Sequence, residues 1–300
     1  MPLAGADFPR PAEIKTYHIN TYDRISPKSS GFDGKGKTVL ITGGSDGIGF
    51  SIGRAFAAAG VAKIVIVSRS KEPQEKAKAE LTSKFPDLDV QTFQASVIDD
   101  LDNITSAMQA AGPIDVLVLN AAYSHTMNVP SSTIPTSEIE KTFQANVFTN
   151  WHMIQTYIHS TPAPASGSKT VIAVSSAAAH LDVGGQVGYG ASKAALSRMI
   201  GLLADEYTEE KDNVRIMNYH PGIVATAAAT KDYDGTSEPF FVYEHVDLPG
   251  DFAVWMAGKE AGFLHGRYLW AQWDVEDLLA SKQKVKEDPR YLKIGLTYPY

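Results

Sequence analysis

Short apolar runs alternate with longer amphipathic or charged stretches along most of the chain. Seven runs have the composition of strands: KTVLIT (37–42), KIVIVS (63–68), VQTFQA (90–95), DVLVLN (115–120), KTVIAVSS (169–176), VRIMNYH (214–220) and RYLWAQW (267–273). Continuous apolar runs are typical of strands whose sheet is covered on both faces. The stretches between them, such as Ala-rich 48–60 and charged 71–85, have helical character. This alternation predicts an α/β fold on a parallel, doubly wound β-sheet.

Two segments fall outside the alternating pattern. Residues 1–35 carry scattered charges and prolines, and we interpret them as an N-terminal arm before a single domain that spans 36–300. Residues 227–262 are irregular and rich in aromatic side chains. A loop of that length is unusual in a compact domain. We therefore expect 227–262 to be a substrate lid, or else to contain short helices.

Composition excludes several classes of function. The 300 residues are 44% hydrophobic, which allows one large core, and the net charge of −7 argues against nucleic acid or an anionic membrane surface as a partner. The absence of cysteine excludes disulfides and thiolate metal sites. We see neither a secretory signal nor an apolar run near the ~18 residues of a membrane span, so we expect a cytoplasmic protein.

Three histidines near predicted strand ends do not form a metal site. His125, His180 and His220 lie at such ends, but no pair has metal-ligand spacing on one element. Tyr123, His125 and His180 could touch a substrate, and packing is an equal alternative for each.

A glycine-rich loop, TGGSDGIG (42–49), directly follows the first predicted strand and opens a helix. Gly43, Gly47 and Gly49 let the backbone turn sharply and approach a ligand closely. Amides at the start of the helix, together with the helix dipole, favour a pyrophosphate. The alternative is a tight turn that binds nothing.

The pattern Tyr-x-x-x-Lys occurs twice, at Tyr189 with Lys193 and at Tyr207 with Lys211. In a helix this spacing places both side chains on one face, one turn apart. Glycine, alanine and serine surround the first pair and leave room for a ligand. The second pair lies in DEYTEEKD, which has the composition of a solvated helix end. We therefore take the first pair as the candidate.

These motifs, taken together, resemble the short-chain dehydrogenase/reductase family. The glycine loop, Asn120, Asn146, Ser176 and the first Tyr-x-x-x-Lys pair occur in the order and spacing of that family. The resemblance covers roughly residues 35 to 275 and is strongest to fungal members, many of them tied to secondary metabolism. It implies a Rossmann-type sheet with strand order 3-2-1-4-5-6-7, and a homodimer or homotetramer.

The resemblance also implies a catalytic set of Asn146, Ser176, Tyr189 and Lys193. In reduction Tyr189 would donate a proton to a carbonyl oxygen that Ser176 also hydrogen-bonds. Lys193 and an oxidised nicotinamide would lower the tyrosine pKa, and Asn146 would relay protons from Lys193 through water. Taken alone, Asn146 reads as a helix-surface asparagine.

The implied cofactor is NADP(H). Arg69 follows Ser68 at the tip of the second strand, where an arginine accommodates the 2′-phosphate of NADP; a solvated surface charge is the alternative. Asp46 stands where some NADP-preferring relatives carry a basic residue, so the preference rests on Arg69. The full set of implied cofactor contacts is Gly43, Ser45, Asp46, Gly47, Ile48, Gly49, Ser68, Arg69, Ser70, Ser96, Val97, Asn120, Ala121, Ala122, Tyr189, Lys193, Pro221, Gly222, Ile223 and Thr226.

Two of these positions depart from the family pattern, and one segment follows it. Ser96 replaces an aspartate that meets the adenine, and Ala122 adds a methyl group where the backbone passes close to the cofactor.

HPGIVAT (220–226) resembles the segment that holds the nicotinamide amide through the backbone of Ile223 and the hydroxyl of Thr226. An ordinary turn after a strand is the alternative for this segment.

The sequence as a whole predicts an NADPH-dependent reductase of a small-molecule, hydrophobic, polyketide-like ketone. An NAD-dependent alcohol dehydrogenase is one alternative. A non-redox cofactor-binding scaffold or a cyclase on the same fold is another.

Overall fold

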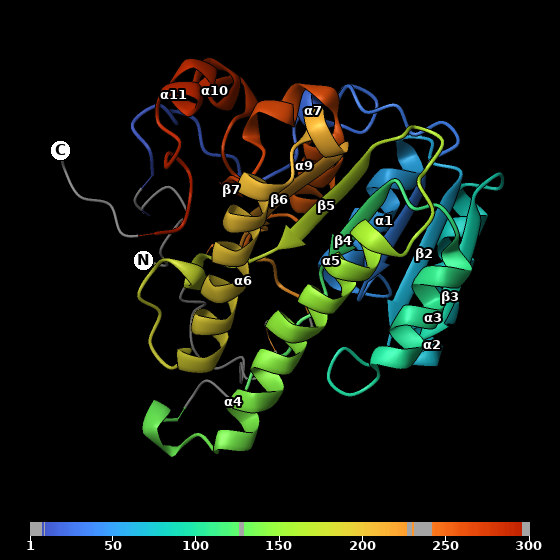
Figure 1. Ribbon diagram of the computed structural model, residues 1–300, viewed down its shortest axis with the longest axis horizontal. Helices are drawn as coiled ribbons and strands as arrows, with labels where there is room; N and C mark the ends of the chain where they lie inside the picture. The colour runs from blue at the N-terminus through green and yellow to red at the C-terminus, as the bar shows by residue number, and fades with distance from the viewer. Residues whose placement is uncertain (1–7, 9, 126–128, 227–229, 231–241, 296–300) are drawn as a thin grey trace.

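A seven-stranded parallel sheet forms the centre of the molecule (Figure 1). The computed structural model describes residues 8, 10–125, 129–226, 230 and 242–295. The strands are β1 (Thr38–Thr42), β2 (Lys63–Ser68), β3 (Asp89–Gln94), β4 (Val116–Leu119), β5 (Lys169–Val174), β6 (Val214–His220) and β7 (Tyr268–Trp270). Their order is β3-β2-β1-β4-β5-β6-β7, with every neighbouring pair parallel. The predicted fold class and strand order are confirmed.

Helices cover both faces of the sheet. They are α1 (Gly47–Ala58), α2 (Lys71–Lys84), α3 (Leu101–Ala111), α4 (Thr136–Phe143), α5 (Thr149–His159), α6 (Val187–Glu206), α7 (Glu209–Asp212), α9 (Asp247–Ala257), α10 (Val275–Ala280) and α11 (Lys282–Glu287). Successive strand residues point to opposite faces. Val39 and Ile41 of β1 therefore join the cluster with α1 and α9, whereas Leu40 joins the cluster with α3, α5 and α6. This is why the strands read as continuous apolar runs.

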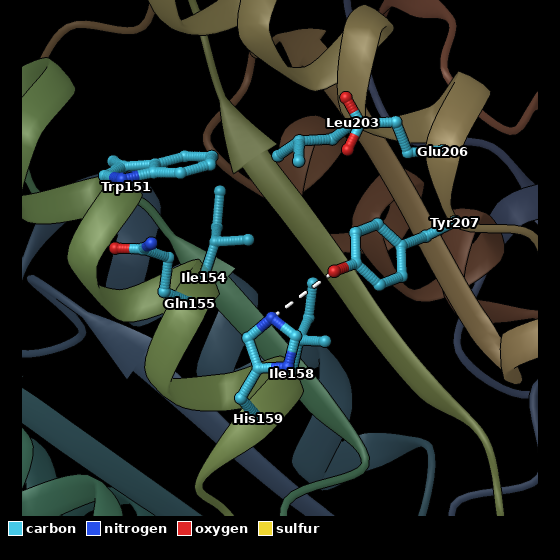
Figure 2. Close-up of a pocket in the computed structure, with 8 residues that line it drawn as sticks. All are labelled: Trp151, Ile154, Gln155, Ile158, His159, Leu203, Glu206 and Tyr207. Atoms are coloured by element: carbon cyan, nitrogen blue, oxygen red, sulfur yellow. Dashed lines mark hydrogen bonds between the residues drawn. The ribbon is translucent and has the colours of Figure 1, made fainter.

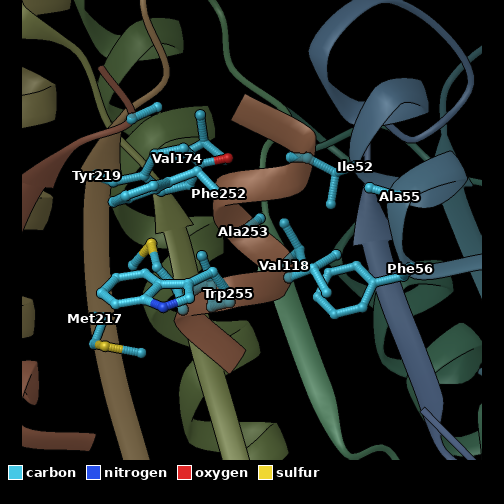
Figure 3. Packing of buried hydrophobic residues seen from close by; sticks show 14 of the residues in the cluster. Ile52, Ala55, Phe56, Val118, Val174, Met217, Tyr219, Phe252, Ala253 and Trp255 are labelled. Atoms are coloured by element: carbon cyan, nitrogen blue, oxygen red, sulfur yellow. The ribbon is translucent and has the colours of Figure 1, made fainter. Parts of the chain in front are cut away.

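The core on one face is built where α9 packs against both α1 and the sheet (Figure 3). Phe252 and Trp255 of α9 are completely buried, as are Ile52 and Phe56 of α1. Each such side chain contributes about 1.5–3 kcal/mol on burial. Residues 247–257, which fall in the segment predicted as a lid, are therefore part of the core.

The lid prediction needs correction for that reason. Helix α9 is held by its apolar side chains, and a lid must be free to leave the surface. Of the remaining predicted lid, residues 227–229 and 231–241, which include Tyr233, Phe240 and Phe241, lie outside the described residues. The alternative, that 227–262 contains short helices, is correct for α9.

The described part of the N-terminal arm packs onto the domain. Ile14 and Ile25 are buried in the core, and Tyr17 forms an antiparallel bridge with Trp273. Arg24 makes ion pairs with Glu260 and Glu276. Residues 10–35 therefore cover the C-terminal part of the domain. Within the described ranges, no helix has both the length and the apolar character needed to cross a membrane.

Candidate active site

The glycine loop joins β1 to α1 at the carboxyl edge of the sheet, where ligands bind in such folds. Gly43 and Gly47 have φ angles of +66° and +54°, which favour glycine. A Cβ on Gly49 would lie 2.2 Å from the carbonyl oxygen of Gly43 and 2.5 Å from Asn120 Nδ2. Asp46 caps α1, and its Oδ1 accepts the Gly47 N–H at 2.7 Å. The loop is therefore held in a conformation that only small residues permit.

Asn120 links this loop to the end of β4. Its Nδ2 donates to the carbonyl oxygen of Thr42 at 2.9 Å, and the Thr42 hydroxyl accepts the N–H groups of Asn120 and Ala121 at 3.0 Å each. Ala122, the next residue, is exposed. The predicted contacts at Asn120 and Ala121 thus lie beside the glycine loop, and Ala122 lies at the open side of the same edge.

The predicted adenine end lies after β2 and β3. The Ser68 hydroxyl accepts a hydrogen bond from Gln74 Nε2 at 2.9 Å, and Gln94 Nε2 donates to the carbonyl oxygen of Arg69 at 2.9 Å. These bonds fix the backbone while the side chains of Arg69 and Ser70 remain exposed. An exposed guanidinium held on a fixed backbone can bind a phosphate, and it can equally be a solvated charge.

Ser96 uses its hydroxyl locally. It accepts the N–H of Ile98 at 3.2 Å, a short-range turn contact after β3. The next residue, Val97, offers its carbonyl oxygen to Thr149 Oγ1 at 2.8 Å. The Ser96 hydroxyl therefore stabilises this loop without bringing a charge, unlike the aspartate that the family pattern has at this position.

The structure brings Ser176, Tyr189 and Lys193 together. Tyr189 lies in the first turn of α6, with Lys193 one turn on and its Nζ 5.7 Å from the centre of the Tyr189 ring. Lys193 is buried, and its ammonium donates to the carbonyl oxygen of Val174 at 2.8 Å. Ser176 follows β5, and its side chain hydrogen-bonds Tyr189. Tyr268 on β7 fixes the Ser176 backbone by donating to its carbonyl oxygen at 2.6 Å.

The pKa values of the pair follow from burial. Burial raises the pKa of Tyr189, partly opposed by the hydrogen bond from Ser176. Burial also lowers the pKa of Lys193 to about 8, because an ammonium is poorly solvated inside the protein. The sequence predicts a lowered tyrosine pKa, but the side chains of the protein by themselves act in the opposite direction.

Asn146 is fully buried, so the alternative of a helix-surface asparagine is wrong. It lies in a π-helical turn, Gln144–Phe148, between α4 and α5. Its Nδ2 donates to the carbonyl oxygen of Tyr123 and to Ser192 Oγ, both at 2.9 Å, and its Oδ1 accepts the Tyr123 N–H at 2.9 Å. Asn146 thus ties the loop after β4 to α6. Its own carbonyl oxygen accepts Asn150 Nδ2 at 2.9 Å.

The turn after β6 reaches the glycine loop but uses Ile223 differently from the prediction. A Cβ on Gly47 would meet Thr226 at 3.0 Å, so Thr226 borders the loop. The Ile223 N–H donates to Glu244 Oε2 at 2.6 Å, and the Ile223 carbonyl oxygen accepts the Glu244 N–H at 3.0 Å. The amide proton predicted to hold a nicotinamide amide is therefore taken by Glu244. Pro221 and Gly222, whose φ is +102°, shape the turn as predicted.

The three histidines near strand ends have packing or structural roles. His220 is buried, its Nδ1 accepts the Ala177 N–H at 3.0 Å, and burial lowers its pKa to about 3. His125 is also buried and accepts the Gly188 N–H at 3.1 Å. His180 accepts a hydrogen bond from Trp270 Nε1 at 3.1 Å. Over the described ranges no group of three or more His, Cys, Asp or Glu side chains could hold a metal ion.

Tyr207 lies far from this site, at the end of α6. Figure 2 shows its hydroxyl pointing across a surface groove between α5 and α6 toward His159, whose Nε2 is 3.3 Å away. Trp151, Ile154 and Leu203 also line this groove. The choice of Tyr189 over Tyr207 therefore agrees with the arrangement of Ser176 and Lys193.

The residues at this edge fit a dinucleotide. Gly43 and Gly47 lack a Cβ where Asn120 and Thr226 approach within about 3 Å, which leaves backbone facing the crevice. The sequence reading missed Tyr268, Glu244 and the structural use of His220. Each lies far along the chain from the motif it supports. The one hint in the sequence is that the last predicted strands end in aromatic and polar residues.

Known proteins resemble this chain along most of its length. A sequence model of the family described as short chain dehydrogenase matches residues 37–236. Short chain dehydrogenase/reductase nsrO from Aspergillus novofumigatus is 47% identical over 290 residues, which are 96% of this chain and 97% of that protein. Short chain dehydrogenase/reductase AacuD from Aspergillus aculeatus is 44% identical over 289 residues, 96% of this chain and 97% of that protein.

Solved structures share the fold. The crystal structure of L-sorbose reductase from Gluconobacter frateurii, complexed with NADPH and L-sorbose, matches with a TM-score of 0.66 and 22% identity, over 80% of this chain and 96% of that chain. A short chain dehydrogenase/reductase family protein matches with a TM-score of 0.67 and 24% identity, over 80% of this chain and 97% of that chain.

Proposed function

Since this chain belongs to the short-chain dehydrogenase/reductase family and is most like fungal members, we propose that it is an NADPH-dependent ketoreductase. The observation that carries the proposal is the convergence of Ser176, Tyr189 and Lys193 beside the glycine loop. A reduced nicotinamide, when bound, supplies a hydride to a carbonyl carbon. The side chains of the protein supply everything else.

Ser176 and Tyr189 act on the carbonyl oxygen. The Ser176 hydroxyl accepts the Ala178 N–H at 3.3 Å and hydrogen-bonds Tyr189; with substrate bound, its proton would turn from Tyr189 to the carbonyl oxygen as negative charge develops. Tyr189 donates the proton that completes the alcohol. Because Tyr268 holds the Ser176 backbone and α6 holds Tyr189, both donors are fixed before substrate arrives.

Lys193 and Asn146 support Tyr189. Lys193 donates one N–H to the Val174 carbonyl oxygen, which leaves two N–H groups for the ribose hydroxyls. Its positive charge also acts on Tyr189. Asn146 fixes the loop after β4 against α6, and its proposed relay of protons would run from Lys193 through water. The buried ammonium, with its lowered pKa, suits proton exchange near neutral pH.

The preference for NADPH rests on Arg69, whose exposed guanidinium suits a 2′-phosphate. The solved relative L-sorbose reductase carries NADPH, which agrees with this choice. One observation favours NAD, and with it the alcohol dehydrogenase alternative. The exposed Asp46 carboxylate caps α1 on the same side and would repel a phosphate.

We propose a hydrophobic, polyketide-like ketone as substrate, in fungal secondary metabolism and in the cytoplasm. We also propose a homodimer or homotetramer. Phe148, the last residue of the π-helical turn before α5, and Leu202 on α6 are 57% and 46% exposed. Large apolar side chains on neighbouring helices favour contact with a second copy.

The test has two steps. Dissociation constants of NADPH and NADH are compared first, and tighter binding of NADPH supports the role of Arg69. Tyr189→Phe is then compared with Tyr207→Phe, the same change near the other end of α6, in ketone reduction with the better cofactor. We expect Tyr189→Phe to lower kcat by about 10²–10⁴ with unchanged cofactor affinity, and Tyr207→Phe to have no effect. Unimpaired ketone reduction by Tyr189→Phe would refute Tyr189 as the proton donor, and a wild type that binds the cofactor but reduces no ketone would favour the non-redox scaffold or cyclase.

A further inference from the structure

We propose that Glu244 is a charged positioning residue at the nicotinamide end of the site: it fixes the Ile223 turn and favours the cationic, oxidised form of the cofactor. This inference rests on the proposed function. Glu244 lies outside every motif that the sequence offers, within the predicted lid (227–262) and just before α9.

Glu244 is buried and bonded at both carboxylate oxygens. Its side chain is only 3% exposed; Oε2 accepts the Ile223 N–H at 2.6 Å and Oε1 accepts the Tyr17 hydroxyl at 3.1 Å. With its own N–H on the Ile223 carbonyl oxygen at 3.0 Å, it holds both backbone groups of that residue. The 2.6 Å distance is typical of a bond to an ionised acceptor.

This carboxylate lacks a counter-ion within the described part of the chain. No Lys, Arg or His there forms an ion pair with Glu244, whereas buried charges in proteins are normally paired. Burial raises the pKa of Glu244 above its ordinary value, and the donors from Ile223, Tyr17 and Gln272 oppose that rise only in part. A cation that binds nearby would complete the site electrostatically.

The location points to the nicotinamide. Strand β6, which leads into the Ile223 turn, lies beside β5, which leads into Ser176. On its other side the turn reaches Gly47 through Thr226. Glu244 therefore lies behind the segment between the proton donors and the pyrophosphate loop, where the reacting ring of a dinucleotide must be.

A second buried polar group faces the same turn. Gln272 is fully buried; its side chain hydrogen-bonds the Glu244 carboxylate, and its Oε1 has no hydrogen-bond partner among the described residues. A Cβ on Gly222 would lie 2.7 Å from Gln272 Nε2 and 3.2 Å from Glu244 Oε2. A buried amide oxygen without a partner, next to a carboxylate without a counter-ion, is costly for stability alone, and it suits a site that binds a polar ligand.

The N-terminal arm holds this arrangement from behind. Besides the Tyr17 hydroxyl, the arm offers the Ile19 carbonyl oxygen to the His245 N–H at 2.8 Å, and its His18 N–H bonds the Gln272 carbonyl oxygen at 2.7 Å. The arm thus contacts the segments that carry Glu244 and Gln272, which gives it a role in shaping the site.

The experiment measures binding, not turnover. Dissociation constants of NADP⁺ and NADPH are determined by calorimetry for the wild type and for Glu244→Gln, which keeps the size and one acceptor oxygen for the Ile223 N–H but removes the charge. We expect the affinity for NADP⁺ relative to NADPH to fall about fivefold, from a unit charge acting over several ångströms of partly screened protein. Asp251→Asn is the matched control, since Asp251 is a buried carboxylate that bonds Thr21 of the arm. Its ratio should stay at the wild-type value.

The outcomes separate this inference from the function it rests on. Equal weakening of both cofactor forms, or an unchanged ratio, would overturn the charged role of Glu244. If the wild type binds neither form, the proposed function itself fails. Should Glu244→Gln be insoluble, Glu244→Asp and Glu244→Asn make the same comparison with side chains one methylene shorter. Only Glu244→Asn, which removes the charge, should change the ratio of the NADP⁺ and NADPH affinities.

Discussion

Substitution of Gly49 by alanine should have two opposing effects on stability, and it therefore tests the conformation of the glycine loop. Gly49 and Gly53 lie one turn apart in α1. In either position Gly→Ala removes backbone freedom from the unfolded chain and raises helix propensity, by about 1 kcal/mol. The surroundings differ. A Cβ at Gly53 would meet only Ile41 Cδ1, at 3.5 Å, which is ordinary contact.

At Gly49 the new methyl group would have no room. It would lie 2.2 Å from the Gly43 carbonyl oxygen, where ordinary contact begins at 3.4 Å, and 2.5 Å from Asn120 Nδ2. Because the nearest atom belongs to backbone, the glycine loop itself must move. Overpacking of this kind costs about 1–3 kcal/mol or somewhat more. We therefore expect Gly49→Ala to be destabilised by roughly 1–2 kcal/mol net and Gly53→Ala to gain about 0.5–1 kcal/mol.

Urea unfolding measures both variants against the wild type, and a cofactor titration follows. The two free energies of unfolding should differ by about 1.5–3 kcal/mol with equal m values. Only Gly49→Ala should also lose affinity for NADPH, since the moved loop is the one that faces the pyrophosphate. Equal stability of the two variants would refute the close approach of α1 to the loop. Normal binding by a destabilised Gly49→Ala would refute the role of the loop in the cofactor site.

Two further predictions concern buried side chains. Lys193 has a pKa of about 8 in the folded protein and 10.5 in the unfolded chain. Below pH 8 its buried charge therefore lowers the free energy of unfolding by about 3 kcal/mol. This cost disappears as the pH rises toward 10.5, because the folded protein then holds a neutral lysine. The stability advantage of Lys193→Met over the wild type should therefore shrink between pH 7 and pH 10 in urea unfolding, and a constant difference would contradict the lowered pKa. Trp255→Ala should lose about 3–5 kcal/mol, because the ring is completely buried between α9 and its neighbours; a loss below 1 kcal/mol in thermal unfolding would place α9 outside the core.

The sequence could predict the features that depend on local pattern. A parallel sheet covered on both faces follows from apolar runs that alternate with helices, whereas the strand order is implied by the family resemblance. Tyr189 could be preferred to Tyr207 because the neighbours of each are visible in the sequence. Such arguments need no knowledge of which distant residues meet.

Helix α9 illustrates what local pattern could not predict. Pro249 and Gly250 lie in its first turn and read as helix breakers. Proline is tolerated there, where a helix has unpaired N–H groups anyway. Gly250 lets α9 approach α1 closely, since a Cβ would come within 2.7 Å of Ser51 Oγ. A tertiary contact thus determines the helix that the sequence alone made look like a loop.

The pKa of Tyr189 depends on tertiary structure in the same way, and it bears on the direction of the reaction. Sequence spacing places Lys193 one turn away and so predicts a lowered pKa, but spacing carries no information about burial. In the folded protein burial raises the tyrosine pKa and lowers that of the lysine. A raised pKa keeps the hydroxyl protonated at neutral pH, which is the state required of a proton donor in ketone reduction. Alcohol oxidation requires tyrosinate, so the burial of Tyr189 raises the pH at which the cofactor-free protein could begin that reaction.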